Sequence, residues 1–369
     1  MPRPMSFTTP WLLPRSCAYS STSRITSVSA CVYPWRAMAR RVTSVSSASF
    51  TFNAVAPRGD STRGRRGTTA RHARLRSAPW AVSSKDDPIP GRGDAVTSEP
   101  VPIHYTVGNL ADAFDMAIER DVADPNNLTI DDLAPADEFH IGGREATASL
   151  MSRLGITKET RLLDIGAGIG GPARFVARAY GCAVNGVELT PEYAEVANML
   201  TARVGLESQV AVEHADALEM QFADATFDGA YMLHAGMNIA DKPALFREVR
   251  RVLKTGGPFG IYDVLRGPNP RPMAFPLPWA SSPDASFLAT IDELRAALER
   301  AGFAVERAED KTEFALRFFE QTREGASHPP RALGPHLLMG ENAREKYANM
   351  VRNVAVKCCA PWEVVARRR

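Results

Sequence analysis

A glycine-rich loop and an aspartate beside it are the residues of this chain best placed to hold a nucleotide-like cofactor. The stretch "RLLDIGAGIGGP" (161–172) places Asp164 two residues before Gly166, and Gly166, Gly168 and Gly171 fit the pattern G-x-G-x-x-G. Glycines after a strand let the backbone approach a ligand closely, and this pattern is the fingerprint of dinucleotide-binding proteins. The loop alone therefore predicts a cofactor and leaves its identity open.

Three carboxylates near this loop indicate a cofactor without phosphate. A carboxylate at Asp164 would repel a pyrophosphate and attract an ammonium group. Glu188, at the end of the next predicted strand, can accept hydrogen bonds from both hydroxyls of a ribose. Asp216 can accept from an adenine amino group, beside the backbone N–H of Ala217. S-adenosylmethionine carries an ammonium, a ribose and an adenine without phosphate, so we expect this cofactor, with NAD(P) and oxidoreductase chemistry as the alternative.

Two residues at predicted strand ends are candidates for the chemistry of methyl transfer. His234 lies in "MLHAGMNIADK" and Asp263 in "IYDVL". The methyl donor is already activated, so positioning of the acceptor accounts for most of the catalysis. A general base is needed only if the acceptor loses a proton, and an imidazole can take one near neutral pH. The alternatives are that His234 only lines the cofactor pocket and that Asp263 caps a loop.

The elements that must position these residues alternate between strands and helices. Apolar runs predict strands at 161–165, 182–189, 209–216, 227–234, 258–265 and 303–310, with a last, antiparallel edge strand at 360–369. Amphipathic stretches predict helices at 171–180, 190–205, 241–257 and 290–302. This order implies an α/β, doubly wound, Rossmann-like fold whose seven-stranded, mostly parallel sheet carries helices on both faces. Its ligands should lie beyond the carboxyl ends of the strands.

Four motifs in this order resemble those of class I S-adenosylmethionine-dependent methyltransferases, and most of all the small-molecule subgroup of ubiquinone-, tocopherol- and sarcosine-type enzymes. They read "LLDIGAGIGG", "VEL", "HADALEMQFADATFDGAYMLH" and "LFREVRRVLKTGG". The resemblance extends from about Tyr105 to the C-terminus. It implies a set of cofactor-binding residues: Asp164, Gly166, Gly168, Gly170, Glu188, Leu189, Asp216 and Ala217. A catalytically inactive protein that still binds the cofactor is the remaining alternative.

The resemblance also implies that a segment before the loop closes over the methionine end of the cofactor. In "DEFHIGGREAT" the matching residues are His140, Gly142 and Gly143. They belong to a predicted N-terminal helical cap (103–155) on a cofactor-binding core (156–369).

A proline-rich insert is the expected cover for the acceptor. Residues 265–288 carry six prolines, and such a long irregular insert in a compact domain is usually functional. We expect Tyr105, Phe275 and Trp279 to contact the acceptor. An aromatic, proline-framed pocket suits a quinol or phenol and could equally hold an amine or a sulfur metabolite, so the acceptor stays open.

The first 84 residues differ in composition from the rest of the chain. They hold thirteen Arg, no Lys, fifteen Ser and one acidic residue, which is typical of an organellar transit peptide or of a disordered tail. We expect a leader (1–84), then a linker (85–102), and localisation in a plastid or mitochondrion, or otherwise in the cytoplasm.

Without that leader the chain is acidic. Of 44 basic and 42 acidic residues, 31 and 41 remain, a net charge of −10, which disfavours nucleic acid as a partner. No apolar run reaches the roughly 18 residues that cross a bilayer, so no transmembrane segment is expected. The adjacent Cys358 and Cys359 lack metal-ligand spacing, and we expect no metal site.

Overall fold

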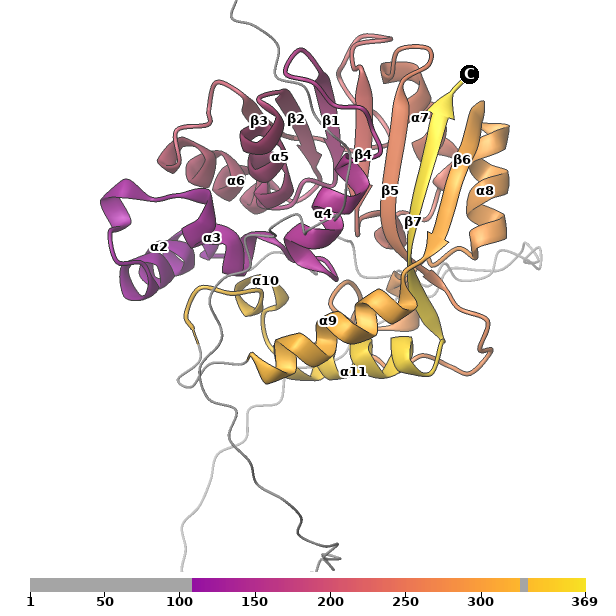
Figure 1. Cartoon of the computed structure of the whole chain (residues 1–369). Helices are drawn as coiled ribbons and strands as arrows, with labels where there is room; N and C mark the ends of the chain where they lie inside the picture. Colours follow the sequence, from indigo (N-terminus) through magenta and orange to yellow (C-terminus); the bar gives the residue numbers. More distant parts are fainter. Residues whose placement is uncertain (1–107, 326–330) are drawn as a thin grey trace, which may run out of the picture. The chain divides into compact units, whose positions relative to one another are not determined.

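A seven-stranded sheet forms the centre of the computed structural model, which describes residues 108–325 and 331–369 (Figure 1). The strands follow one another in space in the order β3-β2-β1-β4-β5-β7-β6. Strands β1 to β5 pair in parallel, whereas β7 pairs antiparallel with both β5 and β6. The predicted doubly wound, Rossmann-like fold with a mostly parallel sheet is confirmed. The strands are Arg161–Ile165 (β1), Ala183–Glu188 (β2), Val210–His214 (β3), Gly229–Leu233 (β4), Pro258–Arg266 (β5), Phe303–Asp310 (β6) and Cys359–Arg368 (β7).

The last strand differs from the expectation in its position. β7 is antiparallel, but it inserts between β5 and β6, so β6 is the strand at that edge of the sheet. The three consecutive residues Val364, Val365 and Ala366 are all buried, which shows that both faces of β7 are covered. β6 reads "FAVERAED" and buries fully only Phe303. A charged strand suits an edge because charges oppose pairing with another chain.

Helices cover both faces of the sheet. Leu162 of β1 shares a buried cluster with Leu150 and Val176 on one face, and Leu163 packs against Leu245 on the other. Because successive residues of a strand point to opposite faces, Asp164 lies on the same face as Leu162. The helices of that face are Gly143–Met151 (α4), Gly171–Tyr180 (α5) and Pro191–Arg203 (α6), and those of the other are Lys242–Val252 (α7) and Ile291–Arg300 (α8).

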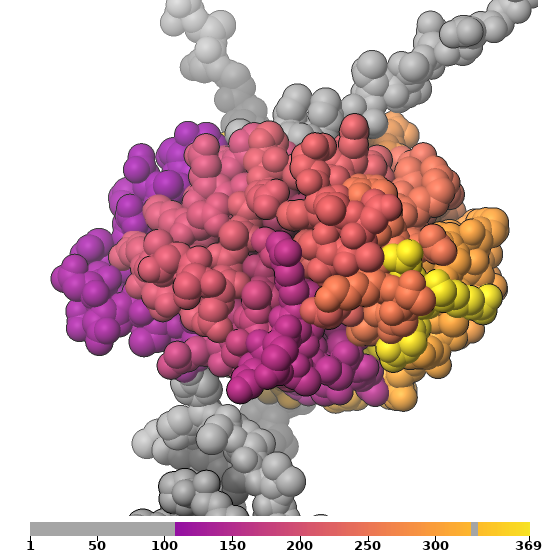
Figure 2. Space-filling view, turned by 90° about the horizontal axis from the view of Figure 1, so that it is seen from above, coloured from indigo at the N-terminus to yellow at the C-terminus, as the bar shows by residue number. Residues whose placement is uncertain are grey.

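The remaining helices gather at one end of the sheet. Figure 1 shows them below the end toward which the parallel strands point, opposite the arrowhead of β7. Figure 2 views the opposite end, where the C-terminal residues, in yellow, lie beside segments from the middle of the chain. These helices are Leu110–Asp121 (α2), Ile130–Asp137 (α3), Thr312–Glu324 (α9), His336–Met339 (α10) and Ala343–Ala355 (α11), with short 3-10 turns at Pro125–Asn127 (η1), Gly236–Asn238 (η2) and Pro283–Ala285 (η3).

Local sequence signals account for several helix starts. Thr290 accepts the backbone N–H of Glu293, whose side chain accepts from the backbone N–H of Thr290, a reciprocal capping box before α8. Pro191 stands at the first position of α6, where its missing N–H costs nothing. Thr190 precedes α6, but its side chain makes no capping bond. Its backbone N–H instead donates to the Glu188 carboxylate at 2.8 Å.

Several predictions fall outside the described residues. The predicted leader (1–84), the linker (85–102) and Tyr105 are among them, and they remain predictions. The described residues belong to one compact unit, Ile89–Arg369. Within 108–325 and 331–369, no helix has both the length and the apolar character that crossing a membrane requires.

Candidate active site

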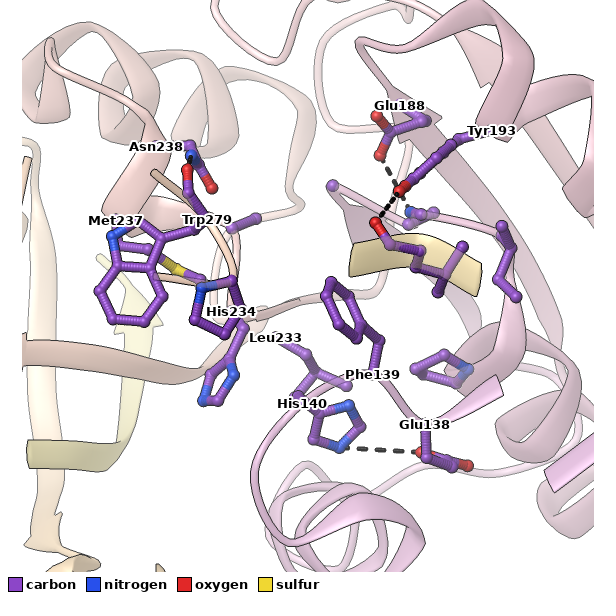
Figure 3. Close-up of a pocket in the computed structure, with 18 of the residues that line it drawn as sticks. Glu138, Phe139, His140, Glu188, Tyr193, Leu233, His234, Met237, Asn238 and Trp279 are labelled. Carbon is purple, nitrogen blue, oxygen red and sulfur yellow. Dashed lines mark hydrogen bonds and ion pairs between the residues drawn. The ribbon is translucent and has the colours of Figure 1, made fainter. Parts of the chain in front are cut away.

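A pocket opens beyond the carboxyl ends of β1, β2 and β4, with a cavity volume of about 270 Å³ (Figure 3). Strand order reverses between β1 and β4, and ligands of doubly wound sheets bind at such a switch point. The pocket has a polar half near the glycine loop and an apolar half under α9 to α11. The sheet-side walls include Asp164, Gly166, Gly168, Val187, Glu188, Leu189, Asp216, Ala217, Leu233 and His234.

The glycines of the loop divide into two groups. Gly166 and Gly168 line the pocket, and both have positive φ, which favours glycine. A side chain on Gly166 would overlap Ala235, while a Cβ on Gly168 would meet no atom within 4 Å. Gly168 therefore leaves open space for a ligand. Gly170 is not a lining residue and instead precedes α5 with φ of 77°.

Asp164 is the most deeply buried acid of the sheet-side wall. Its side chain lines the pocket, and only 2% of the residue is exposed. One carboxylate oxygen accepts a hydrogen bond from the hydroxyl of Tyr231 at 2.9 Å. Burial raises the pKa of Asp164 to about 7. A cationic group in the pocket would stabilise its ionised form.

Glu188 and Asp216 lie on the same side of the pocket. The two oxygens of Glu188 accept the backbone N–H groups of Thr190 and Gly168, at 2.8 and 2.9 Å. A carboxylate offers about four acceptor positions, so two bonds leave capacity for a ligand. Asp216 accepts from the N–H of Leu218 at 2.8 Å, and its neighbour Ala217 also lines the pocket.

The predicted closing segment lies across the pocket from the strands. Its residue His140 lines the wall, but Gly142 and Gly143 do not. A Cβ on Gly142 would overlap the Phe314 ring, so this glycine allows α9 to pack against the segment. At the start of the segment, Asp137 forms a fully buried ion pair of 2.6 Å with Arg174 of α5, which fixes the segment to the helix that follows the glycine loop.

The two residues predicted for catalysis are not brought together. His234 lines the pocket, and its ring stacks on Tyr262 with centroids 5.2 Å apart. Burial lowers the pKa of His234 well below its ordinary value, so the ring is neutral. Asp263 is not a lining residue: its carboxylate accepts the backbone N–H groups of Val264 and Met237. Asp263 thus supports the turn η2 from behind, as in the capping alternative.

The proline-rich insert contributes one of its two predicted contacts to the wall. Trp279 lines the pocket, and its indole N–H donates to the Ser286 hydroxyl at 2.9 Å. Its carbonyl accepts from the Asn238 amide at 2.8 Å. Phe275 is not a lining residue and packs instead into the cluster around Leu277 beneath the insert.

Sequence reasoning missed the contribution of helix α9 to the apolar half. Helix α9 and the stretch from 335 to 350 supply its walls, with Phe318, Phe319, Thr322, Pro335, Leu338, Met339, Tyr347 and Met350. The signal was present in "TEFALRFFEQT", whose apolar residues recur at helical spacing. Glu138 and Phe139, beside the predicted His140, also line the pocket and were not singled out.

Charge in the pocket is all of one sign. Five acidic residues line it, and among the described lining residues none is Lys or Arg. Neither 108–325 nor 331–369 contains a group of three His, Cys, Asp or Glu side chains placed to hold a metal ion. Such walls attract cationic groups and repel phosphate.

Comparisons with known proteins match the centre of this chain. The family model for the methyltransferase domain matches residues 163–261. The methyltransferase phqN of Penicillium fellutanum is 37% identical over 116 residues, which are 31% of this chain and 36% of that protein. The 27-O-demethylrifamycin SV methyltransferase of Amycolatopsis mediterranei is 32% identical over 195 residues, 49% of this chain and 72% of that protein. The chain spans less than half the length of phqN and of two further curated relatives that it matches.

Solved structures share the fold. The phosphoethanolamine N-methyltransferase 2 of Haemonchus contortus, in complex with S-adenosyl-L-methionine, aligns with a TM-score of 0.53 and 20% identity. The alignment covers 74% of this chain and 60% of that chain. At this identity the likeness extends to the fold alone.

Proposed function

Because this chain belongs to the family of S-adenosylmethionine-dependent methyltransferases, we propose that it methylates a hydroxyl group of a largely apolar, non-anionic small molecule. The observation that carries the choice of acceptor is a pair of neutral histidines, the buried His140 and the half-buried His234, in a wall that is otherwise mostly apolar. An oxygen acceptor must lose its proton when it is methylated, and a neutral imidazole can take part in that transfer.

The polar half of the pocket fits the cofactor of this family. The open space above Gly168 and the carboxylates of Asp164 and Glu188 form a cradle without a cation. In this cradle Asp164 would hold the ammonium group, Glu188 the ribose hydroxyls and Asp216 the adenine. The bound sulfonium supplies a methyl group that is already activated. The absence of Lys and Arg from the described wall opposes a dinucleotide, whose pyrophosphate would meet only acids.

The apolar half of the pocket supports an acceptor without phosphate. Trp279, Phe318, Phe319 and Met350 present carbon surface, while Thr322 adds a polar side chain. Apolar walls with few polar groups favour a hydrophobic ligand whose orientation those groups set. An amine acceptor that is already neutral needs no base, and a thioether needs none, so neither would explain two neutral histidines.

A labelled-donor screen tests this proposal. The full chain is incubated with methyl-labelled S-adenosylmethionine and a panel of apolar phenols and quinols, matched amines and matched thiols. Labelled ether products are expected from the hydroxyl compounds. Labelling confined to amines or thiols would overturn the choice of acceptor. Calorimetry with S-adenosylhomocysteine is the companion measurement, because lack of binding would overturn the assignment of the cofactor.

A further inference from the structure

The hydrogen bonds of His140 fix which of its ring nitrogens carries the proton. Nε2 lies 3.0 Å from the carbonyl oxygen of Gly143 and 3.0 Å from Oγ1 of Thr147. A carbonyl oxygen can only accept, so Nε2 must donate. The Thr147 hydroxyl itself donates to the Glu138 carboxylate at 3.2 Å, which leaves its lone pairs free to accept from His140. Both contacts therefore assign the proton to Nε2, and Nδ1 carries a lone pair.

The lone pair of His140 lies on the pocket side of the ring. Figure 3 shows Nε2 turned toward Glu138, with 3.7 Å between Nε2 and the nearer carboxylate oxygen, and the second nitrogen turned away from Glu138. Nδ1 has no hydrogen bond to any residue within the described ranges. His140 is thus a buried imidazole whose Nε2 faces an orienting carboxylate and whose Nδ1 is an available acceptor.

In His234 the nitrogen that could accept a proton is already hydrogen-bonded. The backbone N–H of Ile141 donates to Nδ1 of His234 at 3.4 Å, so the neutral ring carries its proton on Nε2. That Nε2 is buried and has no hydrogen-bond partner among the described residues. This N–H is therefore not offered at the pocket surface, and the other ring nitrogen is already hydrogen-bonded. His234 therefore lacks the free lone pair that a proton acceptor needs.

The two rings are neighbours at the boundary between the two halves of the pocket. Their centroids are 5.9 Å apart and their planes are nearly perpendicular, at 83°. His234 follows β4, which pairs with β1, the strand that leads into the glycine loop. His140 faces it from the closing segment through the bond between Ile141 and His234. A hydroxyl bound at this boundary would meet the acceptor nitrogen of His140.

We propose that His140, oriented by Glu138, accepts the proton of the acceptor hydroxyl. This inference rests on the proposed function. As the acceptor oxygen forms its bond to the methyl carbon, the carbon–sulfur bond breaks and its electron pair stays on sulfur. The hydroxyl proton passes to Nδ1 of His140, so the positive charge that began on sulfur ends on an imidazolium. His140 is the catalytic residue, and Glu138 is a positioning residue that also faces this new charge.

The charges around His140 are consistent with this role. Burial lowers its pKa to about 4, so the ring is neutral and its lone pair is available at neutral pH. Glu138 is the nearest acid, and the guanidinium of Arg144 lies 3.6 Å from its other oxygen. The ring also lies beside two neutral rings, those of His234 and Tyr262. An imidazolium formed there would be stabilised chiefly by Glu138, at short distance and away from water.

The first test reads the ring nitrogens directly and needs no acceptor. The full chain is labelled with ¹⁵N in histidine only, saturated with S-adenosylhomocysteine, and studied by proton–nitrogen correlation spectra at pH 7. The H140Q and H234Q variants assign the signals. We expect both rings to be neutral with the proton on Nε2. A proton on Nδ1 of His140 would overturn the proposal, whatever the acceptor proves to be.

The second test separates catalysis from folding, using a hydroxyl compound that the labelled-donor screen finds to be methylated. Glutamine at position 140 can still donate to the Gly143 carbonyl but offers no basic nitrogen at the Nδ1 position. We expect H140Q to lower kcat by about 10²- to 10⁴-fold, with an unchanged acceptor KM and unchanged affinity for S-adenosylhomocysteine. E138Q should lower kcat less, again without loss of affinity. The exposed His214 gives the matched control H214Q, which should behave as wild type.

The outcomes distinguish failure of the proposed function from failure of the assignment of His140 as the base. If no hydroxyl compound is methylated, the proposed function fails, and the spectra still decide whether His140 has a free lone pair. If hydroxyl compounds are methylated and H140Q keeps kcat within about threefold, the assignment of the base fails and the proposed function stands. If H140Q loses affinity for S-adenosylhomocysteine, the E138Q variant decides whether His140 acts in catalysis or in structure. Parallel losses of affinity and kcat in E138Q would show a structural role and overturn the proposal.

Discussion

Replacing Gly171 by alanine should displace the closing segment from the cofactor pocket. A Cβ at this position would lie 2.6 Å from the carbonyl carbon of Asp137, a distance that real Cβ contacts essentially never show. The obstacle is backbone, so no side-chain rotation can relieve it. Overpacking of this kind costs about 1–3 kcal/mol. The direct relief is movement of Asp137, which begins the run of pocket-lining residues 137–141.

The expected cost appears as lost affinity for the cofactor product. A penalty of about 1–3 kcal/mol corresponds to roughly 5- to 150-fold weaker binding of S-adenosylhomocysteine, measured by calorimetry well below the unfolding temperature. Arg178 lies on the exposed side of the same helix, so Arg178→Ala is the matched control and should bind like wild type. If Gly171→Ala bound S-adenosylhomocysteine within twofold of wild type, the closing segment would not depend on this contact.

Three further predictions concern other parts of the pocket. Burial raises the pKa of Asp164 to about 7, and the hydroxyl of Tyr231 is its hydrogen-bond partner. Because only the ionised carboxylate attracts the ammonium group, the affinity for S-adenosylhomocysteine should fall by about tenfold for each pH unit below 7. Calorimetry of Asp164→Asn should show no such dependence on pH. Arg174→Met leaves the buried Asp137 without its ion-pair partner and should cost about 3–5 kcal/mol in urea unfolding, with part of the loss recovered by adding Asp137→Asn. Trp279→Phe removes part of the apolar wall and the hydrogen bond to Ser286. We expect an acceptor KM about fivefold higher than that of wild type. A fivefold loss of affinity for S-adenosylhomocysteine would contradict the assignment of this wall to the acceptor.

The sheet and the cofactor half of the pocket were predictable because their signals are local. Strand β1 and its glycine loop are one continuous stretch, and the parallel pairing of β2 and β4 with β1 brings Glu188 and His234 to the same edge as Asp164. In a parallel sheet the carboxyl ends of neighbouring strands meet, so knowing the strand ends is enough to place these residues together. The expectation that they share one pocket needed no long-range contact.

The acceptor half depended on contacts that the sequence does not encode locally. Helix α9 follows β6 and crosses the end of the sheet, where Phe318 and Phe319 face the pocket. Their spacing predicts a helix, but not which face of the protein it covers. Asp263 illustrates a related ambiguity: a residue near a strand end can face the ligand or the turn beside it, and the bonds to Val264 and Met237 turn its carboxylate toward η2.

The cofactor cradle and the acceptor wall come from different elements, so a substitution in one can leave the function of the other unchanged. The cofactor cradle comes from residues on β1 and β2 and from the loop after β3, while the acceptor wall comes from η2, the insert and helices α9 to α11. The closing segment bridges them, since Asp137 is tied to α5 by Arg174 and Ile141 donates to His234. A substitution at Phe318 should therefore alter the acceptor KM alone, whereas one at Asp137 should alter both cofactor affinity and kcat. That difference follows from which elements each residue joins, and it identifies the segment Asp137–Ile141 as the place where binding of the donor is coupled to the position of the acceptor.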